Sequence, residues 1–198
     1  MNVAEPMTLI TDLLLTIAAL VFAARLWRVH RMWALAFLFT AAGSFFGGMH
    51  HGFAPSMAPI AALLLWKATL FSIGIASFFL LAGSGRAWTI VAIVKLVIYM
   101  SWMIVHNDFV WVIADYGLTL LLIGIAQLAR RGPSTPWVIG SIVVSVIAAL
   151  VQQSRFALHR HFNHNDLYHL TQMVALWLLY RCGRVMSSST APPTNRPT

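Results

Sequence analysis

The sequence predicts an all-α membrane protein, a bundle of seven transmembrane helices. Of its 198 residues, 60% are hydrophobic and only 9% are charged, and the mean hydropathy is +0.79. Apolar runs of about 18–25 residues recur along the chain, and such runs are long enough to cross a hydrocarbon core of about 30 Å as helices. The runs are continuously apolar and do not alternate at every second residue, which excludes a transmembrane β-barrel.

The first apolar run is expected to be a retained helix. It follows the segment M-N-V-A-E-P-M, which has no basic region, and no small-residue cleavage site follows the run. Cys182 is the single cysteine, so an internal disulfide is excluded. The net charge of +8 is explained by membrane topology, and we expect no nucleic-acid partner.

Seven spans are predicted from the apolar runs, at residues 7–27, 33–53, 58–82, 88–105, 109–129, 136–157 and 166–181. The connections are short, so sequential helices should be antiparallel neighbours. Residues 1–186 would form one transmembrane domain, and the polar, proline-rich segment 187–198 would be a disordered cytoplasmic tail.

The distribution of basic residues predicts the orientation. Only Arg155 and Arg160 lie on one side, whereas nine arginines lie on the other: Arg25, Arg28, Arg31, Arg86, Arg130, Arg131, Arg181, Arg184 and Arg196. Because basic residues favour the cytoplasmic side, the amino terminus should be outside and the carboxy terminus in the cytoplasm. The chain is compact and has no glycosylation sequon, which favours a bacterial inner membrane with the outer side facing the periplasm.

Acids and histidines gather in the outer half of the predicted bundle. All five acids and seven of the eight histidines fall there, and four of these histidines lie in the stretch H-R-H-F-N-H-N-D-L-Y-H, residues 159–169. One explanation is topological, since the positive-inside bias leaves the outer side for acids. Histidine is mostly neutral near pH 7 and has no such bias, so its presence indicates a site.

Two spans contribute the clearest candidates for that site. Ser44 and His51 are seven residues apart and share one face of the second span, whereas His50 points about 100° away. Gly47 and Gly48 allow a neighbouring helix to approach closely just below the two histidines. In the seventh span, the three-residue interval between Asp166 and His169 places both on one face.

Charged side chains inside spans need partners. Asp115 should face the interior, either as a general base or paired with Lys67 or with a histidine of the 159–169 cluster, and Asp12 has the same roles open to it. We expect Lys67 to pair with Asp12 or Asp115. Lys95 lies nearer the cytoplasmic side, where it should extend to the interface without a role in the site.

Imidazoles and carboxylates close together suit a zinc ion with an open water position. His51, His164 and His169 are the predicted ligands, with His50 as the alternative from the second span. Asp115 would be the general base for the zinc-bound water, and Ser44 would steady the water or the oxyanion. The specific expectation is that His50 or His51 meets His169 and that Asp115 borders the same cavity.

This layout resembles the alkaline ceramidase and adiponectin-receptor superfamily of seven-helix membrane hydrolases. The resemblance implies hydrolysis of a lipid amide, with zinc held by one histidine of the second helix and two of the seventh. By position, Ser44 matches the serine of that superfamily, His51 the first ligand and His169 one of the last two. The chain differs in having Asn165 where a paired histidine is expected and no acid early in the third span.

The leading hypothesis is therefore a zinc-dependent hydrolase that acts on a lipid or lipid-like amide or ester at the outer membrane face. A second hypothesis is a protein that handles haem, metal ions or protons through its outer histidines. A third is a non-catalytic subunit, in which the histidine cluster binds a further copy of the chain or another subunit of a membrane complex. Membrane lipid is the expected partner in the first case.

Overall fold

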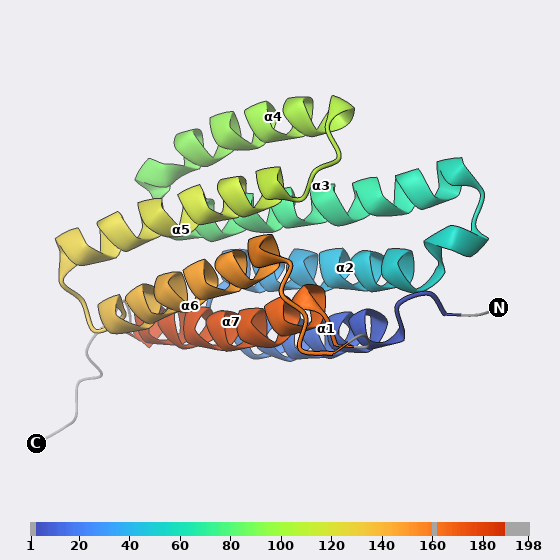
Figure 1. Ribbon diagram of the computed structural model, residues 1–198. Coiled ribbons are helices and arrows are strands. Elements are labelled where there is room, and N and C mark those ends of the chain that lie inside the picture. The colour runs from blue at the N-terminus through green and yellow to red at the C-terminus, as the bar shows by residue number, and fades with distance from the viewer. Residues whose placement is uncertain (1–2, 160–161, 189–198) are drawn as a thin grey trace, which may run out of the picture.

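The computed structural model describes residues 3–159 and 162–188. This part of the chain contains seven α-helices, two short 3-10 helices and one isolated β-bridge between His159 and Phe162 (Figure 1). The predicted all-α class with seven helices is confirmed. The α-helices are α1 (Pro6–Leu26), α2 (Arg31–Phe53), α3 (Pro59–Gly83), α4 (Thr89–Val105), α5 (Val110–Arg130), α6 (Thr135–Ser154) and α7 (His164–Ser188).

Six of the seven helices, α1 to α6, are long and apolar enough to cross a membrane. Helix α7 is 25 residues long but is not among them. Its first turn is polar and includes Asp166, and Arg181 and Arg184 lie toward its other end. The predicted set of seven spans thus reduces to six by length and composition, although α7 is packed within the same bundle.

The helix boundaries agree with the predicted spans within two residues for the first five helices. Helix α6 ends at Ser154, earlier than expected, because Arg155 adopts a left-handed conformation with φ 54°. Helix α7 continues past residue 181 to Ser188. Gly183 lies inside the helix and does not end it. Its role is to leave room for the Trp33 ring, because a Cβ at this position would lie 2.8 Å from a ring carbon. Residues 189–198 of the predicted tail lie outside the described residues.

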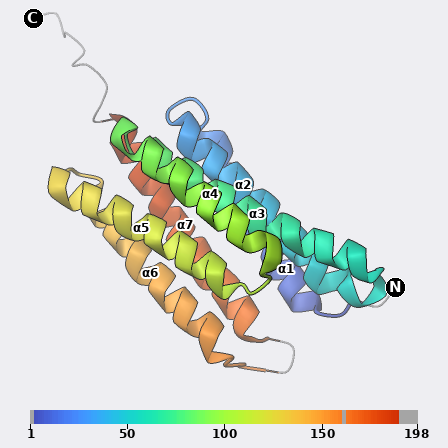
Figure 2. The same ribbon diagram turned by 90° about the horizontal axis from the view of Figure 1, so that it is seen from above.

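Six helices form a closed ring, and α4 lies outside it. Around the ring, α1 packs on α2, α2 on α3, α3 on α5, α5 on α6, α6 on α7 and α7 on α1. Helix α4 packs on α3, and Figures 1 and 2 show it at the edge of the bundle. Helices α4 and α5 contact each other through side chains, including Trp102 and Trp111, but α5 packs its backbone more closely on α3 and so takes the place in the ring.

Helix α4 is attached mainly by polar contacts and one aromatic ring. Its buried residues are Ala92, Tyr99 and Met103. The Tyr99 hydroxyl donates to the carbonyl oxygen of Leu70 at 2.9 Å, and its ring covers Gly74, where a Cβ would lie 2.2 Å from a ring carbon. Gly74 is therefore required for this close approach.

Lys67 holds the carboxy-terminal end of α4. Its ammonium group donates to the carbonyl oxygens of Met103, Ile104 (3.0 Å) and His106 (2.8 Å). These carbonyls lack helical partners because the helix ends there, and the cation also complements the negative end of the helix dipole. The predicted pairing of Lys67 with Asp12 or Asp115 is wrong, since unpaired carbonyls satisfy the ammonium group as well as an acid would.

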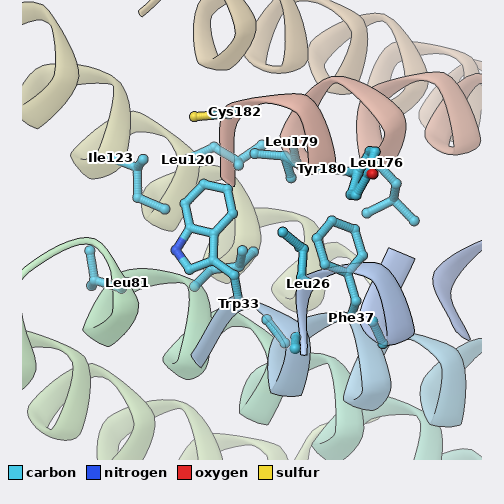
Figure 3. Close-up of a cluster of buried hydrophobic side chains, with 14 of the residues drawn as sticks. Leu26, Trp33, Phe37, Leu81, Leu120, Ile123, Leu176, Leu179, Tyr180 and Cys182 are labelled. Atoms are coloured by element: carbon cyan, nitrogen blue, oxygen red, sulfur yellow. The ribbon is translucent and has the colours of Figure 1, made fainter. Parts of the chain in front are cut away.

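The half of the ring that contains the end of α1 and the start of α2 is filled with apolar side chains. Trp33 and Phe37 of α2 pack between Leu26 of α1 and Leu179 and Tyr180 of α7, all of them buried (Figure 3). These large buried side chains fill the interior of the ring at this level. Most of the acids and histidines lie in the other half.

Candidate functional site

Two side chains that are distant in sequence form a buried pair inside the ring. Nε2 of His169, on α7, lies 3.3 Å from Oδ1 of Asp12, on α1. The side chains are 9% and 4% exposed, so the pair is nearly shielded from solvent and lipid. A carboxylate within reach of an imidazole fixes the ring orientation and supports proton transfer at the ring.

The other ring nitrogen of His169 also has a partner. Nδ1 lies 3.1 Å from the hydroxyl of Thr11, which is also 3.5 Å from Oδ1 of Asp166. Thr11 and Asp12 are adjacent on α1, so one turn of that helix contacts both sides of the imidazole. His169 is therefore held by two consecutive residues, which leaves the ring little freedom to rotate.

The start of α7 is fixed by a capping box. The side-chain oxygen of Asn163 accepts the backbone N–H of Asn165 at 2.8 Å, and Asp166 Oδ2 accepts the backbone N–H of Asn163 at 2.7 Å. These reciprocal bonds satisfy two amides that have no partner within the helix. The cap sets where α7 begins and so places His169 opposite α1.

Glycines of α2 make room for Asp12. A Cβ on Gly48 would lie 2.8 Å from the Cβ of Asp12, and one on Gly47 would lie 3.7 Å from its Oδ2. The expectation that these glycines admit a neighbouring helix is confirmed, and the neighbour is α1. A side chain at position 48 would push α1 outward and separate Asp12 from His169.

A cavity of about 260 Å³ lies beside this pair. All six ring helices contribute to its lining, which includes Asp12 and His169 together with Ser44 and His51 of α2. Most of the remaining lining is apolar and comes from α3, α5 and α6. The cavity therefore has the character of a site for an amphiphilic molecule, because a small number of polar groups interrupt a largely apolar wall.

His51 is held at the edge of the cavity by the segment before α1. Its Nδ1 lies 3.3 Å from Oε2 of Glu5. The neighbouring imidazole lowers the pKa of the Glu5 carboxyl. Glu5 thus favours its ionised form next to His51 and ties the start of α1 to the end of α2.

Four polar atoms with no hydrogen-bond partner among the described residues belong to side chains that line this one cavity. They are Oδ2 of Asp12, the Tyr116 hydroxyl, Oγ of Ser145 and Oε1 of Gln152. Buried polar groups without partners are costly in a membrane interior. Two of the four are pure acceptors if Asp12 is ionised, so a molecule that donates hydrogen bonds would satisfy them.

The cavity reaches the outer surface of the ring between α5 and α6. Val146 of α6 lines it and is 53% exposed, and Gly117 of α5 lines it with no atom within 4 Å of the position its Cβ would take. Further along the same two helices the contact is tight, since a Cβ on Gly124 would lie 2.7 Å from Ile142. The opening is thus confined to the half of the ring that holds the polar groups.

The sequence-predicted residues divide between the cavity and other places. His51, Ser44 and His169 line it, as the shared face of Ser44 and His51 predicted. His50 instead lies against the indole of Trp66, with ring centroids 4.9 Å apart and the ring planes tilted by 37°. His164 is the first residue of α7 and is not in the cavity lining.

Asp115 lies away from the cavity and forms an ion pair with Lys95. The same ammonium group donates to the Ser77 hydroxyl at 2.9 Å, which in turn contacts Thr119 at 2.7 Å. The expectation that Lys95 extends to the cytoplasmic interface is wrong, because the nearby carboxylate and hydroxyl compensate its burial. Asp115 also does not border the cavity of His51 and His169.

The described residues do not form a ligand set for the predicted zinc ion. Among the residues that the structure describes, no group of three His, Cys, Asp or Glu side chains is close enough to hold a metal ion. His169 would have to release Asp12 or Thr11 in order to bind one, because both of its ring nitrogens have partners. Zinc therefore stays a prediction from the sequence.

Several cavity residues could not be singled out from the sequence. Tyr116, Ser145 and Gln152 of the lining, and Thr11 beside His169, occur in apolar or ordinary helical contexts with no motif around them. Asp12 did carry a signal, since an acid inside an apolar span needs a partner. Pairing with a histidine of the 159–169 cluster was one of the alternatives left open for it, and the structure selects His169.

The comparisons with known proteins place the chain in a family without identifying its chemistry. No curated protein and no solved structure matches it. One family model, described as a family of unknown function (DUF6962), matches residues 7–188. This match covers every residue of the cavity lining. Glu5, which contacts His51 of the lining, lies outside it. The chain belongs to this family of unknown function.

Proposed function

We propose that the protein is a membrane hydrolase for a lipid-like amide or ester, with Asp12 and His169 as its acid–base pair. The observation that carries the proposal is that this pair and the unpartnered polar atoms line one cavity whose remaining wall is largely apolar. An amphiphile would place its polar head at the pair. Its apolar chain would leave between α5 and α6 at Gly117 and Val146.

The proposed reaction uses water as the nucleophile. The pair takes one proton from the water as its oxygen forms a bond to the carbonyl carbon of the substrate. The same proton then goes to the leaving amine or alcohol as the carbon–nitrogen or carbon–oxygen bond breaks. Asp12 stabilises the imidazolium ring that exists between the two transfers, and Thr11 keeps the ring oriented.

Other polar groups of the cavity are assigned to binding. The hydroxyls of Ser44 and Tyr116 are suited to donate to the carbonyl oxygen as negative charge develops on it. Oε1 of Gln152 is suited to accept from an amide or hydroxyl group of the head, while the Nε2 group of Gln152 is held by Asn165 at 2.9 Å. In this proposal the base comes from α1 and α7, in place of Asp115 on α5.

The test is hydrolysis by the purified full-length protein in detergent, followed by mass spectrometry with synthetic N-acyl and O-acyl amphiphiles as substrates. The wild type should release the free fatty acid, and Asp12→Asn and His169→Gln should each lower the rate at least about a hundredfold, the usual contribution of a general acid–base group. Asp108→Asn is the matched control, since it removes the same charge from an exposed loop. Equal rates in all four proteins would refute the assignment.

A binding protein without hydrolytic activity is the second candidate, favoured by the same unpartnered atoms. In that case lipid would co-purify unchanged with the wild type and be lost from Asp12→Asn, and no fatty acid would be released. Metal analysis of the same preparations tests the zinc hypothesis. One zinc ion per chain, lost in both His51→Ala and His169→Ala, would add a metal to the site.

For localisation, we propose a bacterial inner membrane in which the cavity lies toward the periplasm. The nine arginines on the opposite side support this orientation. A reporter fused after Arg184 should be cytoplasmic, and one inserted near His106 should be periplasmic. The reverse result would place the cavity on the cytoplasmic side.

A further inference from the structure

A second hollow lies between α1 and α7 at the end of the bundle remote from the cavity. It is lined by Arg25 of α1 and by Arg181 and Arg184 of α7, with Trp177, Tyr180 and Val185 completing the wall. None of these residues lines the first cavity. The hollow is therefore a separate feature that the proposed hydrolase does not use.

The distance from the acidic end follows from the two helices. Arg25 follows Asp12 by thirteen residues, and Arg181 follows His169 by twelve, so α1 and α7 run in the same direction. At 1.5 Å per residue, the hollow is about 18–20 Å from the Asp12–His169 pair. The ion pairs between described side chains involve Glu5, Asp12 and Asp115 and no arginine. Three positive charges thus meet without an acid to neutralise them.

The two arginine side chains of α7 are held in place by aromatic residues. The guanidinium carbon of Arg181 lies 4.3 Å from the ring centroid of Trp137 and 5.6 Å from that of Trp177. Nη1 of Arg184 lies 3.4 Å from the Tyr180 hydroxyl. Stacking occupies the face of a guanidinium group and leaves its N–H groups along the edge available to an anion.

We propose that this hollow binds the phosphate group of an anionic phospholipid. Arginine recognises phosphate through paired N–H groups, and basic pockets between membrane helices suit anionic head groups. The exposed indole of Trp177, 41% accessible, and the neighbouring Val185 supply an apolar surface at the same level for the glycerol and the start of the acyl chains. Tryptophan at the membrane–water interface is well placed for such a contact. Free phosphate lacks the part of the ligand that this surface would contact.

The experiment is native mass spectrometry of the full-length protein in detergent with added short-chain phosphatidylglycerol or phosphatidylcholine. Arg181→Gln/Arg184→Gln should weaken phosphatidylglycerol binding by at least about tenfold, since each arginine near a membrane surface contributes roughly fivefold. The matched control is Arg28→Gln/Arg31→Gln, which removes one charge from the α1–α2 connection and one from the first residue of α2, both outside the hollow. It should change binding by less than about threefold.

Arg25→Gln provides an independent variant on the other helix, and its side chain is not stacked on an aromatic ring in the structure. It should weaken phosphatidylglycerol binding about fivefold without loss of folding. Equal effects of the hollow and control variants, or equal affinity for phosphatidylcholine, would overturn the proposal. Displacement of the lipid by inorganic phosphate at equal concentration would overturn the lipid assignment and indicate a site for a free anion.

Discussion

The bundle contains two buried pairs of an acid with a base, and they occupy different kinds of place. Asp12 and His169 join α1 to α7 beside the cavity, whereas Lys95 and Asp115 join α4 to α5 away from it. Both pairs are almost completely buried. The first connects helices that are distant in sequence, and the second connects the peripheral helix α4 to the ring. Residue chemistry therefore does not distinguish them; access to a cavity does.

The difference shows that burial of an acid with a base can have two different roles. Lys95 is surrounded by the Asp115 carboxylate and the Ser77 hydroxyl, and it links the peripheral helix α4 to the ring. Asp12 keeps one oxygen without a partner among the described residues, next to open space. We infer that the first pair stabilises the fold and that the second is positioned to act on a ligand.

The largest expected effect comes from breaking the structural pair. Lys95→Met should lower the free energy of unfolding by about 3–5 kcal/mol, because Asp115 would be left as an unpaired buried charge. Lys95→Met/Asp115→Asn should lose clearly less, since no ion remains buried. The midpoint of unfolding in detergent micelles measures both. Equal losses in the single and double variants would show that the ion pair is not the source of the stability.

Changing the cavity pair should affect binding more than folding. Asp12→Asn is expected to cost about 1.5–3 kcal/mol of stability, the range for a hydrogen bond to a charged group, and to abolish retention of an added N-acyl amphiphile. Asp115→Asn should leave retention of this amphiphile intact wherever the protein is folded. Extraction and mass spectrometry of the amphiphile from the two purified variants provide the comparison, and phosphatidylglycerol is left out because it is assigned to the arginine hollow. Retention of the amphiphile by Asp12→Asn would place its site outside the cavity.

Lys67 offers a comparison with Lys95, since both lysines hold α4. Lys67 contacts neutral carbonyl groups, so Lys67→Met leaves no buried charge behind. We expect a loss of about 1–2 kcal/mol, below that of Lys95→Met. Hydrogen exchange should increase at residues 100–106 and remain unchanged near Asp12. An equal increase in hydrogen exchange throughout the bundle would contradict a local role of Lys67.

The smallest effect concerns the contact between Glu5 and His51. The Glu5 side chain is 43% exposed, so Glu5→Gln should cost only about 0.2–1 kcal/mol. Because the folded-state pKa of Glu5 is lowered below its ordinary value of 4.5, its contribution is complete above that pH and is lost as the pH falls through the lowered pKa. The stability difference between wild type and variant should therefore vanish in acid. A difference that grows as the pH falls through the lowered pKa of Glu5 would refute the direction.

Apolar length and composition were sufficient to predict much of the fold. Each of the first five helices was placed within two residues, because a membrane-spanning helix satisfies its own backbone hydrogen bonds and needs only a long apolar run. Spacing also identified Ser44 and His51 as neighbours on one face of α2, since helical periodicity is a local property. The small residues Gly47 and Gly48 correctly indicated a close helix contact.

Partner choice depended on the tertiary structure. Lys95 rather than Lys67 pairs with Asp115, Lys67 binds carbonyl oxygens at the end of α4, and Asp12 pairs with His169, because pairing depends on which helices are adjacent. The displacement of α4 from the ring set that adjacency, and it results from packing of α5 on α3, which no local pattern encodes. A side chain inside a membrane must find a polar partner, and the sequence shows this requirement. Which partner lies within about 3 Å is decided only when helices pack together whose contacting residues are as many as 158 positions apart in the sequence.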